Sequence, residues 1–380
     1  MTRRSGGWAL AAVAALWGLA AAAQNASSGQ AAPLLRHTFE QDEQGWIALG
    51  PSAQVRTTHE AADVRSGSSA LQFDYAVAKG QINVLILPLP EGAPAGTRSF
   101  SLWAKADAAT TLAVALQERG GARYIALVAA PANRWQEVRL ATSDFVLSDL
   151  GEDPKDPNDQ LDLSEIEAVA MADFGQFPAQ SEDPDIARLI PVKPGPHKLL
   201  VDDFAISAAP LPPTYRVISG ALVPDTFARP QLDWMAVGAT SLSLTAGGPL
   251  NGPGLRAGYR QEAGRLVGLV HALPRGALTG AARLTFTAAS AKPVKLLVQL
   301  EERGGGKYNT AVDLPGDGAM HSYSVNIADM VPADDSKDAN GRLDPSRVKQ
   351  LTLIDVGGLL GMSQGENTLW VGAARPAAGG

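Results

Sequence analysis

The chain has 380 residues, with 39 acidic and 32 basic side chains and no cysteine. The lack of cysteine excludes a disulfide framework, a thiolate metal site and a cysteine nucleophile. A formal charge of −7 argues against nucleic acid as a partner, because such binding uses clustered Lys and Arg to neutralise phosphates. The composition is 45% apolar, enough for a sizeable core, and the length allows two or three domains.

The N-terminus has the pattern of an export signal. Arg3 and Arg4 precede an apolar run over residues 8–23, which ends with Ala21 and Ala23 in the spacing that signal peptidase accepts. We predict a signal peptide over 1–23 and a flexible leader over 24–35. The alternative is an uncleaved membrane anchor, but the run of 16 residues is shorter than the ~20 needed to cross a membrane. No other apolar stretch is long enough, so no span is expected after cleavage. These features predict a secreted, periplasmic or cell-surface protein.

The chain contains an internal repeat. A shift of 184 positions aligns Leu71–Tyr124 with Leu255–Tyr308 without a gap and gives 18 identities in 54 positions. The block Glu118-Arg119-Gly120-Gly121 recurs within this alignment, and weaker matches continue on both sides. We predict two copies of one unit, over 36–209 and 217–376, joined by a proline-rich linker over 210–216.

Within each copy, apolar residues recur with the period of a β-strand. Leu112, Val114 and Leu116 alternate with small or polar residues, and the repeated Gly-Gly that follows favours a hairpin turn. Signals for long amphipathic helices are absent from the sequence. We therefore predict an all-β protein, built from two tandem jelly-roll β-sandwiches.

A loop between these strands is strongly acidic. The segment 144–167 carries nine acidic residues, and Asp156, Asn158, Gln160 and Asp162 have the spacing of an EF-hand calcium loop. Leu161 occupies the position that such a loop reserves for glycine. The sequence therefore favours a solvated acidic loop over an EF-hand.

Short spaced motifs resemble the galactose-binding-like jelly-roll modules. The motifs are Phe39-Glu40, Gly45-Trp46, Ser66–Leu71, Phe100–Lys105, Trp135–Val138, Ser143–Phe145 and Val201–Phe204. This group includes many carbohydrate-binding modules of secreted polysaccharide-degrading proteins, and the complex I intermediate-associated family. The resemblance implies glycan recognition and a structural calcium ion, for which Glu40 with Asp203 or Asp202 occupy the matching positions. The alternative is that these acids are solvated residues at strand ends.

Sugar-binding β-sandwiches use aromatic rings that stack on the pyranose, together with a few polar groups that bind its hydroxyls. The candidate ligand-binding residues, on strand faces and around the hairpin, are Trp103, Gln117, Tyr75, Arg123 and Tyr124. Repeat two has Thr287 in place of Trp103, so the core pattern does not require this tryptophan. Packing is the alternative role for each candidate, and Trp46 and Trp135 are interpreted as structural.

No known catalytic motif is found in the sequence. The five histidines are scattered, and neither a nucleophile elbow nor a P-loop is present. We predict a non-catalytic protein that binds a polysaccharide or glycan, with repeat two as a spacer or a subunit contact. The first alternative is a structural or assembly protein that contacts another protein at the cell surface or in the periplasm. The second is a polysaccharide hydrolase or lyase whose motif we do not recognise.

Overall fold

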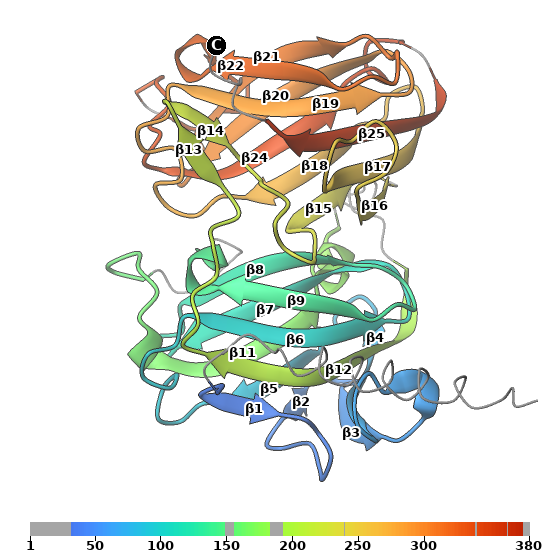
Figure 1. Cartoon of the computed structure of the whole chain (residues 1–380), viewed down its shortest axis with the longest axis vertical. Coiled ribbons are helices and arrows are strands. Elements are labelled where there is room, and N and C mark those ends of the chain that lie inside the picture. The colour runs from blue at the N-terminus through green and yellow to red at the C-terminus, as the bar shows by residue number, and fades with distance from the viewer. Residues whose placement is uncertain are drawn as a thin grey trace, which may run out of the picture.

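Strands make up nearly all of the regular structure in the computed structural model of this chain (Figure 1). It describes residues 32–148, 156–182, 193–238, 240–338, 340–362 and 364–374. The predicted signal peptide, and the predicted leader up to residue 31, lie outside the described residues. Two β-sandwiches follow one another along the chain, which confirms the predicted all-β fold class.

The first sandwich contains two sheets of six strands each. Sheet A has the order β3 (Gln54–Thr58), β4 (Ala70–Val77), β12 (Gly195–Ser207), β6 (Ser99–Ala106) and β9 (Gln136–Ala141), with β1 (Leu35–His37) also paired to β12. Sheet B has the order β10 (Val146–Leu147), β8 (Arg123–Ala130), β7 (Thr110–Glu118), β11 (Ile166–Asp173), β5 (Val84–Pro88) and β2 (Ile47–Leu49).

The second sandwich repeats this topology. Sheet C has the order β13 (Arg216–Ile218), β14 (Ala221–Val223), β19 (Arg283–Ser290), β25 (Gly365–Ala373), β17 (Gly254–Gln261) and β16 (Thr240–Thr245), with β22 (His321–Asn326) also paired to β19. Sheet D has the order β15 (Trp234–Val237), β18 (Val267–Ala272), β24 (Val348–Asp355), β20 (Val294–Glu302), β21 (Lys307–Leu314) and β23 (Val331–Pro332). Residues 208–215 connect the two units.

The strand alternation predicted from the sequence is confirmed on β7. Leu112, Val114 and Leu116 are buried in the core of the first sandwich, between sheets A and B. The repeated Gly-Gly forms the hairpin between β7 and β8, where Gly121 has a φ of 87°. An L-residue rarely adopts this backbone conformation, which explains the glycine at this position.

Among the residues that the structure describes, helical structure is limited to short 3₁₀ turns. These are η1 (Ala61–Asp63), η2 (Thr142–Asp144), η3 (Leu163–Glu165), η4 (Phe174–Gln176), η5 (Pro178–Gln180) and η6 (Ile327–Asp329). Within the described ranges, no helix is long and apolar enough to cross a membrane.

Each sandwich buries one tryptophan with a hydrogen-bonded indole. Trp46 Nε1 donates to His37 Nδ1 at 3.0 Å, and Trp234 Nε1 donates to Asp225 Oδ2 at 2.7 Å. Both rings are almost fully buried, and a buried indole N–H needs an acceptor. The structural role predicted for Trp46 is therefore confirmed.

Candidate functional site

The two tyrosines predicted to bind ligand lie in the core. Tyr75 is 4% exposed and Tyr124 is 3% exposed. Tyr75 Oη donates to Asp173 Oδ2 at 2.9 Å, and Tyr259 makes the equivalent bond to Asp355 Oδ2 at 2.7 Å in repeat two. A buried hydroxyl with the same partner in both repeats serves packing, so the prediction of Tyr75 and Tyr124 as ligand residues is corrected.

The other three candidates do not share one surface. Gln117 and Arg123 face each other across β7 and β8 on the outer face of sheet B. Gln117 Nε2 donates to Glu167 Oε1 at 2.7 Å, and Arg123 Nε donates to Gln117 Oε1 at 3.4 Å. Trp103 lies instead on the outer face of sheet A, on the opposite side of the sandwich. A single site made of all five predicted residues is therefore not formed.

Trp103 is half-buried among polar groups. On β6 it lies opposite Asp202 of β12 and Glu137 of β9. The guanidinium carbon of Arg65 lies 4.0 Å from the centre of the Trp103 ring, within the range of a cation–π contact. Arg65 thus covers one face of the indole. Trp103 also borders a cleft that residues of the second sandwich line.

Trp103 borders a cleft between the two sandwiches. The cleft has a volume of about 320 Å³ and is also lined by Trp135, for which the sequence predicted a structural role. Its remaining lining residues are Ala129, Pro131, Arg134, Gln136, Glu137, Pro230, Leu232, Leu242, Ser243 and Leu244. Trp135 Nε1 is buried and has no hydrogen-bond partner within the described residues. Two indole rings with amide, carboxylate, guanidinium and hydroxyl groups are the chemistry that protein sites use to hold sugars.

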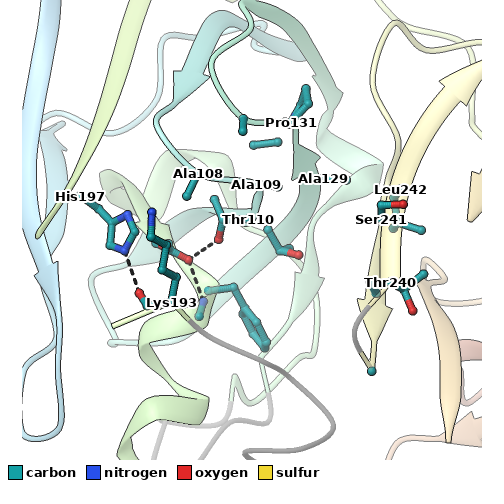
Figure 2. A pocket seen from close by; sticks show the side chains of 18 residues that line it. Ala108, Ala109, Thr110, Ala129, Pro131, Lys193, His197, Thr240, Ser241 and Leu242 are labelled. Carbon is teal, nitrogen blue, oxygen red and sulfur yellow. Dashed lines mark hydrogen bonds between the residues drawn. The ribbon is translucent and has the colours of Figure 1, made fainter. Parts of the chain in front are cut away.

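The cleft continues into a second cavity of about 430 Å³, and the two cavities share Ala129, Pro131 and Leu242. Figure 2 shows Lys193 and His197 on one side of this second cavity and Thr240 with Ser241 on the other. We call the two cavities together the interdomain groove. Because both sandwiches supply its walls, the groove exists only while the repeats hold their mutual position.

Ion pairs fix that position. Arg229 of repeat two donates to Asp144 Oδ2 of repeat one at 3.0 Å, and both side chains are buried. Arg275 and Arg303 bind the carboxylate of Asp159, the former at 3.1 Å. The backbone N–H of Ala129 on β8 also donates to the carbonyl of Leu232 at 2.9 Å. The backbone bond joins β8 of sheet B to the segment before β15 of sheet D, and the ion pairs join turns and loops of the two repeats.

The buried acids at this contact are electrostatically unfavourable. Burial raises the pKa of Asp144, Asp225 and Asp233 above the ordinary value for aspartate, and Asp233 is raised well above it. Arg229 opposes the rise at all three carboxyl groups by its positive charge. Arg229 is therefore a cation that offsets the cost of burying these acids at the contact between the repeats.

The residues predicted to hold calcium are arranged as hydrogen-bond acceptors. Glu40 accepts bonds from the backbone and hydroxyl of Ser68, and Asp203 Oδ1 accepts from Arg36 at 2.6 Å. Asp202 accepts from the backbone N–H groups of Arg65, Ser66 and Asp203. The described residues contain no group of three or more histidines or acids placed to hold a metal ion. These carboxylates already accept hydrogen bonds from within the chain, an arrangement that does not favour the calcium ion implied by the sequence resemblance.

A melting experiment tests this point. We expect the melting temperatures measured in millimolar CaCl₂ and in excess EDTA to agree within about 1 °C, because an ion raises stability only where it binds the native state. Differential scanning fluorimetry is the measurement. A Tm several degrees higher in calcium, lost in a Glu40→Gln variant, would instead support the calcium ion that the sequence resemblance implies.

Comparison with known proteins returns solved structures at low identity. A family 11 carbohydrate-binding module of Clostridium thermocellum, in complex with a β-1,3-1,4-mixed-linked tetrasaccharide, has 15% identity over 46% of this chain and 94% of its own, with a TM-score of 0.34. The tandem CBM22-1–CBM22-2 domain of Paenibacillus barcinonensis Xyn10C has 14% identity over 92% of this chain and 99% of its own, with a TM-score of 0.29.

A family 61 module in complex with β-1,4-galactotriose has 14% identity over 46% of this chain and 98% of its own, with a TM-score of 0.30. No family model matches this sequence. No curated protein sequence matches it either.

Proposed function

We propose that this protein binds a polysaccharide without cleaving it, in the interdomain groove, and that it does so outside the cytoplasm. The observation that carries the proposal is the pair of indole rings, Trp103 and Trp135, that line one cleft beside Arg134, Gln136 and Glu137. Indole rings stack on the apolar face of a pyranose, and the neighbouring polar groups bind its hydroxyls.

The acids along the groove support binding rather than hydrolysis. Glycoside hydrolysis uses two carboxyl groups on opposite sides of the scissile bond. Among the described residues that line the groove, the carboxylates are Glu137 and Asp173. Glu137 is held by Arg139 at 2.6 Å, while Asp173 is buried and accepts bonds from Tyr75 and Gly175. Neither group faces a second acid across the groove.

A substitution at Trp103 tests the function. Trp103→Thr installs the residue that repeat two carries at the equivalent strand position, so we expect the fold to persist. We expect affinity for the bound polysaccharide to fall at least tenfold, because loss of a central aromatic contact costs about 1.4 kcal/mol or more. Isothermal titration calorimetry against a polysaccharide panel is the measurement.

Leu49→Ser is the matched control, because Leu49 is 51% exposed and lies on the outer face of sheet B, away from the groove. We expect this variant to bind as the wild type does. If Trp103→Thr binds every polysaccharide as tightly as the wild type, the groove is not the binding site.

A different surface favours the alternative of an assembly protein. On the outer face of sheet B, Ile47, Ile86, Ala170, Ala115 and Ile125 are cross-strand neighbours in one row. Ile47 is 42% exposed. A flat apolar row without aromatic rings is typical of a protein contact rather than a sugar site. If calorimetry detects no binding to any polysaccharide in the panel, the result favours this second function.

A further inference from the structure

The groove is continuous with an outer sheet face of repeat two. Trp103 and Glu137 border the groove from sheet A, and Ser243 of β16 borders it from sheet C. Ser243 lies opposite Arg256 on β17, and Arg256 lies opposite Trp370 on β25. These three residues share one face of sheet C. A ligand that leaves the groove over β16 therefore reaches a further tryptophan.

Trp370 is the counterpart in repeat two of an aliphatic residue in repeat one. It lies opposite Ala289, whereas the equivalent Leu200 lies opposite Lys105. Repeat one instead has Trp103 on the neighbouring strand, at the position that Thr287 occupies in repeat two. Each repeat thus places one half-buried tryptophan on the outer face of the equivalent sheet, A in repeat one and C in repeat two, although on strands that are not equivalent.

Cations without a salt bridge accompany these tryptophans. Arg65 stacks on Trp103, Arg134 borders the cleft, and Arg256 is the cross-strand neighbour of Trp370. All three are exposed, and none forms a salt bridge among the described residues.

Two acids on the same surface pair with other arginines, whereas Asp202, opposite Trp103, is buried and accepts backbone N–H bonds. Glu137 pairs with Arg139, and Glu366 pairs with Arg260 at 3.3 Å. A chain with a formal charge of −7 therefore leaves these three guanidinium groups without a salt bridge among the described residues, close to half-buried indole rings. We call the surface from Arg65 and Trp103, across the cleft with Arg134, to Arg256 and Trp370 the tryptophan–arginine track.

We infer that the ligand is an anionic polysaccharide, bearing carboxylate or sulfate groups, and that it spans both repeats along the tryptophan–arginine track. This inference rests on the proposed function and specifies its substrate class. The planar guanidinium group binds carboxylate and sulfate oxygens in a bidentate manner, and indole rings stack on the sugars between the charges. A neutral glycan gains only the stacking and hydroxyl contacts.

Spanning both repeats also explains why the repeats are locked together. Adjacent strands are about 4.8 Å apart, so the path from β6 over β9, β16 and β17 to β25 is roughly 20 Å or more. A ligand of that length gains affinity from both tryptophans only when the two sandwiches keep a fixed position. The second repeat is then a part of the binding surface rather than a spacer.

The test compares charged and neutral ligands. We expect calorimetry at 50 mM NaCl to give polygalacturonate or dextran sulfate at least tenfold higher affinity per binding site than neutral mixed-linkage β-glucan. We expect this affinity to fall severalfold at 300 mM NaCl, because salt screens exposed charges. Arg256→Gln should weaken anionic binding by about fivefold to tenfold, consistent with loss of one charge-assisted contact.

The matched control is Arg216→Gln. Arg216 is also exposed, but it lies on β13, at the far edge of sheet C from β16. We expect this variant to bind as the wild type does. Arg134→Gln provides a second variant within the groove, and all three keep the full chain.

The outcomes separate this inference from the proposed function. Binding of neutral β-glucan with a salt-independent affinity that Trp103→Thr abolishes would keep the function and overturn the anionic ligand. Wild-type anionic binding in Arg256→Gln and in a Trp370→Leu variant would overturn the role of repeat two. Binding of neither ligand class would overturn the proposed function itself.

Discussion

Replacement of Arg229 by alanine is expected to lower the free energy of unfolding by about 3–5 kcal/mol, the range for breaking a buried ion pair from one side. The Arg229 and Asp144 side chains are only 4% and 8% exposed, so water cannot replace the lost partner. The variant also removes one of the groups that lower the pKa values of Asp225 and Asp233. Urea denaturation followed by tryptophan fluorescence measures the change.

Arg216→Ala is the control for this variant. It removes an exposed arginine from the same repeat, where a change within about 0.5 kcal/mol is expected. If Arg229→Ala changes the free energy of unfolding as little as the control does, the ion pair does not hold the repeats together. A two-step unfolding curve in Arg229→Ala alone would show that the pair couples the two sandwiches.

The repeat and its strands could be predicted from the sequence because they depend on local periodicity. The same periodicity also predicts that Tyr75 and Tyr124 point into the core. Tyr75 is in phase with Leu71 and Phe73, and Tyr124 is in phase with Ala126, so an inward direction follows from the strand period. The prediction of ligand roles gave more weight to the aromatic type of these residues than to their phase.

The groove could not be predicted in the same way, because its two walls come from segments about 100 residues apart. Nothing near Trp135 in the sequence indicates that β16 will face it. One signal was present at the loop that docks the repeats. Asp159 stands where repeat two has Gly341, and both have a positive φ, of 55° and 66°. Aspartate adopts this conformation more readily than most residues, so repeat one can place a carboxylate where repeat two has glycine, and this carboxylate binds Arg275 and Arg303.

The second large expected effect concerns pH and Asp233. The pKa of this carboxyl group is raised well above the ordinary value by desolvation first and then by Asp225 and Asp144. Gln231 Nε2 donates to Asp233 Oδ1 at 3.1 Å, and Arg229 acts against the rise. The backbone carbonyl oxygen of Asp233 accepts a hydrogen bond from His271 Nδ1 at 2.7 Å.

Because the pKa is raised in the folded state, there is a range of pH in which the folded protein keeps this proton and the unfolded chain has released it. Stability then falls as the pH rises from about 4 through the raised value, because the unfolded state is favoured by losing the proton. Asp144 and Asp225 contribute with the same sign, since burial raises their pKa values as well.

Asp233→Asn should therefore make the protein more stable than the wild type at pH 8, and the gain should disappear toward pH 4. An asparagine keeps the acceptor for Gln231 and removes the buried charge, so the effect isolates ionisation from the loss of a hydrogen bond. Urea midpoints measured from pH 4 to 8 are the readout, with the exposed Asp334→Asn as control. A variant destabilised equally at every pH would show that Asp233 contributes through its hydrogen bond alone. Combined with Arg229→Ala, the substitution should recover part of the lost stability, because both changes act on the same buried charge.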